Sequence, residues 1–203
     1  MTGHRATPKF IRLSRDDRRG QLIEAALACL ARGGIQAFTV DRICREAGVS
    51  RGLITHHFGA MSGLLAAAYA RIYRDTTPML SDAVPPAERL DGLIAGYFAP
   101  KVFNRDALNI WLALWGQIAT TEALGQEHRR QYGVYLAEVS AAIAARAAER
   151  GRAVDAGMLA KSLICLVDGL GLQHCLDPEV MPVSAALSAA KAFLEPHLGP
   201  VRP

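Results

Sequence analysis

Residues Gly48–Gly59 read GVSRGLITHHFG, and this stretch decides how the first third of the chain folds. A glycine-containing turn near its start separates two short segments with helical periodicity, residues 39–47 and 50–58. In the second segment the bulky apolar side chains Ile54 and Phe58 stand one helical turn apart. Two short helices joined by such a turn describe a helix-turn-helix, whose second helix enters the major groove of DNA.

The second segment of this motif has an outward face. Because successive side chains on a helix are rotated by about 100°, a core-facing Ile54 and Phe58 place Gly52 and His56 on the opposite side. A glycine there permits close backbone approach, and histidine or threonine side chains hydrogen-bond base edges or phosphates. The residues on this face and along its edges are Arg51, Gly52, Leu53, Thr55, His56 and His57.

The adjacent histidines His56 and His57 admit other interpretations. Metal binding is disfavoured because neighbouring side chains on a helix diverge by about 100° and no HExxH motif or cysteine partner lies nearby. Catalysis is disfavoured because no orienting acid stands within one helical turn, so we expect no catalytic residue, metal or cofactor. Core packing is the alternative for His57. An all-α enzyme using His56, His57 or His174, and an interaction module without DNA binding, are the rival classes.

Basic charge gathers in the N-terminal third of the chain. The net charge of the 203 residues is +4. Residues 1–58 carry ten Lys/Arg and five Asp/Glu, whereas the remaining residues carry thirteen and fourteen. This distribution indicates a polyanion partner for the first segment alone, and a solvated basic tail is the simpler alternative.

Helical periodicity continues along the whole chain, with no convincing strand or hairpin, so we expect an all-α protein of about nine helices. Ser14 with Asp17, Thr39 and Ser50 are the predicted caps of the first three helices. The expected helices cover about 14–33, 40–47, 50–58, 62–80, 87–98, 105 onward, 122–150, 155–176 and 184–198.

The composition of the chain indicates the cellular compartment of the protein. A hydrophobic content of 51% supports a sizeable core, and no apolar run approaches the roughly 20 residues of a membrane span. The N-terminus does not resemble a secretory signal, so we expect a cytoplasmic protein with no membrane partner. The cysteines lack CxxC spacing and fall in apolar helical patterns, which predicts reduced, buried thiols. They are Cys29, Cys44, Cys165 and Cys175.

Residues 39–58, TVDRICREAGVSRGLITHHF, resemble the DNA-binding domain of the TetR family, and the preceding helix fits as well. The resemblance implies a homodimeric regulator in which three helices bind DNA and the rest form a ligand-binding and dimerising body. The helix-turn-helix domain is then 14–60, preceded by a basic arm, 1–13, and followed by the α-helical body, 61–203. The implied DNA contacts are Thr39, Val40, Ser50, Arg51, Gly52, Leu53, Thr55, His56 and His57.

Within that family, the stretches ITHHFG, NIWLALW and LVDGL are similar to the BetI branch, repressors of choline-to-betaine genes. This similarity implies a ligand-responsive repressor on a palindromic operator, with choline or a related amine as effector. Another amine or an aromatic ligand is the alternative. Three positions depart from the branch: Met61 replaces a phosphate-contacting lysine, Ala99 an acidic residue and Gly171 a tryptophan. Losing one phosphate contact lowers the salt dependence of DNA binding by about 0.9 log units per log unit of salt.

Aromatic residues of the body are candidates for a ligand pocket. Trp111 and Trp115 stand one helical turn apart, and an aromatic cage attracts a quaternary ammonium by about 0.5–2 kcal/mol per ring. Ordinary core packing is the alternative. The predicted pocket residues are Tyr97, Phe98, Phe103, Trp111 and Trp115, with Asp91 or Asp106 as candidate partners of a cation.

The last two expected helices carry leucine-rich faces. Such faces form a four-helix interface with a twofold mate, whereas a monomer buries them in its own core. Dimerisation is favoured because two recognition helices reach successive major grooves about 34–36 Å apart. The predicted interface residues are Leu159, Leu163, Leu166, Leu170, Leu187, Ala190 and Leu194.

Overall fold

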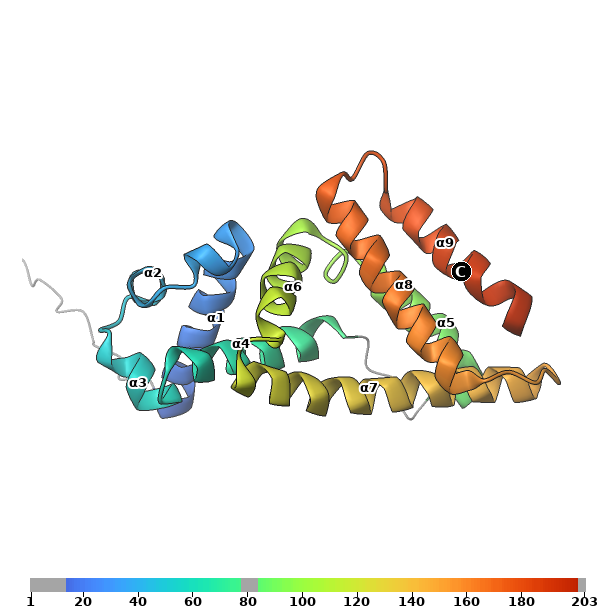
Figure 1. Cartoon of the computed structure of the whole chain (residues 1–203), viewed down its shortest axis with the longest axis horizontal. Helices are drawn as coiled ribbons and strands as arrows, with labels where there is room; N and C mark the ends of the chain where they lie inside the picture. Colours follow the sequence, from blue (N-terminus) through green and yellow to red (C-terminus); the bar gives the residue numbers. More distant parts are fainter. Residues whose placement is uncertain (1–13, 78–83, 201–203) are drawn as a thin grey trace, which may run out of the picture.

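The computed structural model describes residues 14–77 and 84–200, and over these ranges the chain is helical with no strand. Its elongated shape has α1–α3 at one end and α8–α9 at the other, as Figure 1 shows. The elements are α1 Arg15–Gly33, the 3-10 turn η1 Ile35–Ala37, α2 Val40–Ala47, α3 Gly52–Phe58, α4 Met61–Thr76, α5 Pro86–Tyr97, α6 Arg105–Ile118, α7 Glu122–Glu149, α8 Ala156–Leu176 and α9 Val183–Leu198.

The predicted capping of the first two helices is confirmed. The Ser14 hydroxyl accepts a hydrogen bond from the Asp17 backbone N–H at 3.0 Å, and the Asp17 carboxylate accepts one from the Ser14 backbone N–H at 3.2 Å. The Thr39 hydroxyl accepts from the N–H of Arg42 at 3.4 Å. Gly48 ends α2 with φ at 62°, a left-handed conformation that glycine adopts at little cost.

The predicted Ser50 cap of α3 is wrong. Arg51 holds the N-cap position with helical backbone angles, and no side chain caps the helix. A capping serine needs an extended backbone immediately before the first helical residue. Here the turn winds directly into α3, with the Leu53 N–H donating to the Ser50 carbonyl at 3.2 Å.

The helix α4 joins the end of the molecule formed by α1–α3 to the body (Figure 1). Its buried Leu64 packs in the same core as Leu22, Leu30 and Ile43 of α1 and α2. The expected helix ran to residue 80, but α4 ends at Thr76, and residues 78–83 lie outside the described part of the chain.

A second core fills the body between α5, α7, α8 and α9. Arg146 of α7 is only 2% exposed, and its guanidinium lies 2.6 Å from the Asp91 carboxylate of α5. A buried arginine needs such a partner because desolvation of an uncompensated charge is costly. The pairing also assigns Asp91 to the core rather than to a ligand.

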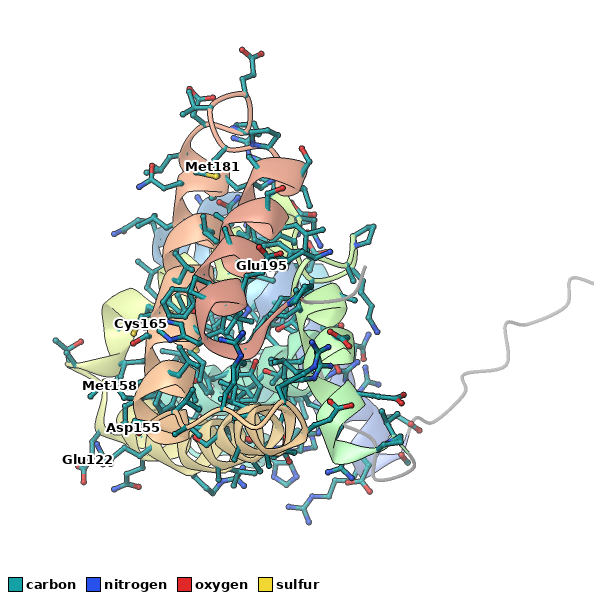
Figure 2. The ribbon with its side chains drawn as sticks, turned by 90° about the vertical axis from the view of Figure 1, so that its right-hand side faces the viewer. Glu122, Asp155, Met158, Cys165, Met181 and Glu195 are labelled. Atoms are coloured by element: carbon teal, nitrogen blue, oxygen red, sulfur yellow. The ribbon has the colours of Figure 1, made fainter. Side chains whose placement is uncertain are left out.

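The helix α8 is apolar on nearly all sides. By length and composition it could cross a membrane, yet only 39% of its most apolar 18-residue window is buried inside the chain. Core helices that pack on two sides have the same composition. Figure 2, which looks onto α8 and α9, labels Met158 and Cys165 on the exposed side of α8. The exposure of Cys165 contradicts the prediction that all four thiols are buried.

Most of the predicted dimer-interface residues lie in the core of their own chain. Five of the seven residues are at most 7% exposed and belong to the chain's own core, so they present no surface to a partner; they are Leu159, Leu163, Leu170, Ala190 and Leu194. Leu166 and Leu187 are partly buried against the same core. The prediction took the most leucine-rich face of each helix, and that face is the one that packs inward. The exposed residues of α8 are Met158, Lys161, Cys165, Asp168, Gly169, Gln173 and Leu176.

Candidate functional site

The predicted DNA-binding residues surround α3. Ile54 is 2% exposed and anchors α3 to the core, so the opposite side of the helix faces solvent. Val40, Leu53 and His57 are partly buried. The exposed members of the set are Thr39, Ser50, Arg51, Gly52, Thr55 and His56.

Two charged contacts orient the ends of α3. A guanidinium nitrogen of Arg51 lies 2.6 Å from the Asp41 carboxylate of α2, and both side chains are exposed, so this pair adds little stability but positions Arg51. The Arg19 guanidinium lies 5.0 Å from the ring centre of Phe58, a cation–π contact between α1 and the end of α3.

The histidine pair lies at the C-terminal half of α3, with ring centres 5.0 Å apart. Partial burial, and then the nearby positive charges of His56 and of arginines in α1, lower the pKa of His57. A neutral imidazole has one donor and one acceptor nitrogen, so His57 offers hydrogen bonds rather than charge at neutral pH.

The junction of α3 and α4 is unusually close. A Cβ atom added to Gly63 would stand 2.2 Å from the backbone oxygen of Phe58, a distance that real Cβ atoms do not reach. Only glycine therefore allows the first turn of α4 to contact the last turn of α3. The two helices are therefore in direct contact at this junction.

The body contains a cavity of about 120 Å3 lined by residues of α4, α5, α6, α7 and α8, whose positions can be followed in Figure 1. Its wall is largely aromatic. The rings of Trp111 and Trp115 stack at 5.7 Å, and Tyr73 meets Trp111 edge-on at 5.8 Å. The aromatic lining residues are Tyr69, Tyr73, Tyr97, Phe103, Trp111, Trp115, His128, Tyr132 and Tyr135.

One carboxylate, that of Asp168 in α8, faces this aromatic cavity. Within residues 14–77 and 84–200, no side chain donates a hydrogen bond to it, and no lysine or arginine lines the cavity. Asp168 as a residue is exposed, but the protein atoms around its carboxylate partly desolvate it and raise its pKa to about 6.

Asp168 shares the cavity wall with several tyrosines and acts on them electrostatically. Four lining tyrosines have a raised pKa, chiefly because they are buried and in part because of the negative charge of Asp168. They are Tyr69, Tyr73, Tyr97 and Tyr132. A carboxylate that borders an aromatic cavity without an ion-pair partner is chemically suited to a cation whose surface is largely apolar.

Two hydrogen bonds fasten α4 to the body, and all four of their residues line the cavity. The Tyr69 hydroxyl and Nδ1 of His128 in α7 are 2.8 Å apart. Burial, and then Arg129, lower the pKa of His128, which keeps the ring neutral and able to accept this bond. The indole N–H of Trp111 in α6 donates to the Thr76 hydroxyl at 3.2 Å. A molecule entering the cavity therefore meets both attachments of α4.

The structure brings together most of the predicted pocket residues. Phe98 is the exception, because it is buried behind Phe103, with ring centres 5.1 Å apart, and does not line the cavity. Asp106 is exposed in the first turn of α6, so neither suggested partner for a cation faces the cavity. Tyr97, Phe103, Trp111 and Trp115 line it, and their contact with a ligand stays a prediction.

Sequence reasoning missed the residue with the most distinctive chemistry. Asp168 is the lone acid within the apolar segment 156–176, and that isolation was the signal available. His174, a candidate of the rival enzyme class, has a structural contact instead: its Nδ1 lies 2.8 Å from the backbone oxygen of Met181.

Comparison with known proteins identifies both parts of the chain. Residues 22–68 match the family described as bacterial regulatory proteins, tetR family. Residues 86–199 match the BetI-type transcriptional repressor C-terminal family. The chain belongs to the TetR family. It is a DNA-binding transcriptional regulator with a BetI-type C-terminal domain, and regulators of the TetR family are not enzymes.

Relatives of this TetR family member are similar over nearly their full length. The HTH-type transcriptional regulator BetI of Burkholderia mallei is 30% identical over 195 residues, covering 92% of this chain and 96% of that protein. A transcriptional regulator of Pseudomonas aeruginosa PAO1 with a solved structure is 36% identical, with a TM-score of 0.78 and coverage of 93% and 94%.

A regulator from Saccharomonospora viridis, solved in complex with choline, has the same fold at a TM-score of 0.76. It is 23% identical and covers 89% of this chain and 97% of its own. Regulators of the TetR family bind DNA operators, act as dimers and bind small-molecule effectors.

Proposed function

We propose that this protein is a homodimeric repressor that binds a palindromic operator in the cytoplasm and releases it when a cationic effector, choline or a related amine, enters the body. The observation that carries the effector half is the unpaired carboxylate of Asp168 in an aromatic cavity without lysine or arginine among its described lining residues. The choline-bound fold relative and the BetI relatives support the same chemical class.

DNA binding is assigned to the exposed side of α3. Gly52 allows close approach to a groove, while Thr55 and His56 offer hydrogen-bonding groups to base edges. Arg51, held by Asp41, and Thr39 at the start of α2 are placed to meet phosphates. Domain boundaries at 14–60 and 61–203 belong to this proposal, with α4 as the connection.

The second subunit is assigned to the exposed side of α8 together with α9. An apolar helix that its own chain leaves largely uncovered is stabilised by a partner, and a twofold mate provides an identical helix. Met158, Cys165 and Leu176 lie on that side.

Release of DNA follows from the position of α4. An effector that prefers the cavity with the Tyr69–His128 or Trp111–Thr76 bond rearranged stabilises a different position of α4. Through Gly63 and Phe58 that position changes the setting of α3 and hence the spacing of two recognition helices. Only such a difference in affinity between the two states shifts the equilibrium.

The proposal is tested with the purified full-length protein and a fluorescent duplex from its own promoter region. Binding is measured by anisotropy at low and physiological salt, with and without choline. Specific binding that weakens with salt and is reversed by choline supports the whole proposal. If choline leaves specific binding unchanged, choline is not the effector. If the protein binds DNA without sequence preference, the operator assignment is wrong.

A further inference from the structure

The cavity wall has an acidic part and an apolar end that are close together. Asp168 and Gly171 both line the cavity from α8, and three residues of helix span about 4.5 Å. The Asp168 carboxylate forms the acidic part. The apolar end is bounded by Val102, Phe103, Leu108 and Gly171, none of which has a side chain that hydrogen-bonds.

Gly171 shapes the apolar end. A Cβ atom added there would stand 3.0 Å from a terminal carbon of Leu108 and 3.8 Å from the ring of Phe103, so any side chain at this position points into that end. Glycine inside a helix costs about 1 kcal/mol relative to alanine, so helix formation does not favour it at this position. Its consequence is that Leu108 and Phe103 pack close to α8 and form the wall of this end of the cavity.

We propose that the effector is an ammonium compound with an apolar arm, an aryl or branched alkyl group that occupies the end formed by Val102, Phe103, Leu108 and Gly171. This rests on the proposed function, in which a cation is held near Asp168. A hydroxyl at the apolar end would lose its hydrogen bonds to water without replacement, which is unfavourable. An apolar group there gains affinity in proportion to the area that it removes from water.

Isothermal titration of the full-length protein with tetramethylammonium, choline and benzyltrimethylammonium tests the arm. These ions share a trimethylated nitrogen and differ in what it carries. We expect benzyltrimethylammonium to bind at least about tenfold more tightly than either of the others, because its ring is buried at the apolar end.

Two variants test which part of the cavity holds the apolar arm of the ligand. Gly171→Leu fills the apolar end and should reduce the affinity for benzyltrimethylammonium at least about tenfold more than that for tetramethylammonium. Leu108→Ala enlarges this end and should favour a naphthylmethyl over a benzyl arm. Gly133→Leu is the control, since Gly133 is an exposed helical glycine of α7 with no atom within 4 Å of an added Cβ.

The outcomes separate this inference from the proposed function. If choline or tetramethylammonium binds as tightly as the benzyl compound, the proposed apolar arm is wrong. The proposal of a cationic effector is then unaffected. A benzyl preference unaffected by both Gly171→Leu and Leu108→Ala places the arm elsewhere and also overturns it. Absence of binding by all three ions removes the cationic effector itself. Circular dichroism and sedimentation confirm that each variant is folded and dimeric.

Discussion

The α3 surface takes its exposed residues from positions 39–56, whereas the cavity takes its lining from positions 69–171. The first is one continuous stretch whose geometry follows from two helices and a turn. The second depends on how helices distant in sequence pack together. The α3 surface also keeps its charges in water, with an exposed pair such as Arg51 and Asp41, while the cavity holds an unpaired carboxylate.

This difference determines how each region tolerates change. A surface that is solvated before it binds DNA gains contacts on binding, so its substitutions affect affinity more than stability. A desolvated carboxylate costs the free protein stability in order to hold a cation later, so substitutions there affect both. Experiments that separate stability from binding therefore distinguish the two regions.

The largest effect is expected from Gly63→Ala, which disrupts the contact between α4 and the end of α3. The new methyl group would stand 2.2 Å from a backbone oxygen, so α3 and α4 must separate. We expect the free energy of unfolding to fall by about 1–3 kcal/mol and operator affinity to fall more than tenfold. Urea unfolding and anisotropy measure these. Gly20→Ala, with nothing within 4 Å of an added Cβ, is the control, and equal behaviour of the two variants would contradict the close contact.

His56→Ala should separate DNA binding from ligand binding. Loss of a base-contacting side chain costs about 1–3 kcal/mol, or roughly tenfold to a hundredfold in operator affinity. Effector affinity measured by titration calorimetry should stay the same. Gln126→Ala removes an exposed polar side chain of α7, away from the proposed DNA, ligand and dimer surfaces, and should change neither quantity. A His56→Ala protein that binds the operator normally would remove His56 from the recognition surface.

Asp168→Asn should weaken ligand binding and leave DNA binding unchanged. Operator affinity is expected to persist, while choline affinity falls about tenfold because the amide has no charge. With an Asp168 pKa of about 6, choline affinity of the unaltered protein should fall by up to tenfold per pH unit below pH 6. This pH dependence should vanish in the variant. A choline affinity that is independent of pH between 5 and 7 in the unaltered protein would exclude Asp168 as the counter-ion.

The pH dependence of protein stability provides a second test of the raised pKa of Asp168. Because its pKa is raised from 3.8 to about 6, the folded protein binds more protons than the unfolded chain between these values. Ligand-free stability therefore decreases as pH rises through this window. Asp168→Asn removes the decrease, so its melting temperature at pH 7 should exceed that of the unaltered protein.

Tyr69→Phe should weaken communication between the regions while sparing each of them. The variant keeps the ring and loses the hydrogen bond to His128, an expected change of about 0.5–1.5 kcal/mol. Choline should still bind, but the ratio of operator affinities with and without choline should change several-fold. Tyr132→Phe is a matched control, since Tyr132 lines the same cavity from α7 rather than α4. A ratio that changes equally in both variants would argue against a role for the α4 attachment.

The smallest effect is expected from Met61→Lys. Met61 begins α4 beside the proposed DNA surface, and a lysine there adds one phosphate contact. The slope of log affinity against log salt should steepen by about 0.9, with sequence preference unchanged. Ser62→Lys tests whether any added charge in this turn has the same effect.

The helix-turn-helix could be predicted because its determinants are local. Thr39 caps α2, Gly48 turns the chain and Ile54 anchors α3, each within a span of 20 residues. The Ser50 cap failed for a local reason too, since the choice between Ser50 and Arg51 depends on backbone angles rather than on side-chain type.

The cavity could be predicted only in part. Periodicity identified Trp111 and Trp115, which are one turn apart, but it gave no distance between α8 and α4, so the grouping of Asp168 with Tyr69 and Tyr73 was inaccessible. The dimer face could not be predicted because periodicity identifies the most apolar side of a helix and does not say which neighbour covers it. In α8 that side is covered by the chain itself.

The uncovered side of α8 has a consequence for how the regulator responds to its own abundance. If this side forms the proposed dimer interface, a subunit without a partner leaves Met158 and Leu176 in water, and we expect pairing and folding to be linked and the paired fraction to depend on concentration. Only the paired form spans two half-sites. At low copy number, operator occupancy therefore rises more steeply than the number of chains per cell, and halving the gene dose lowers repression by more than half. The synthesis rate of the protein thus becomes a second input to the promoter, alongside the effector.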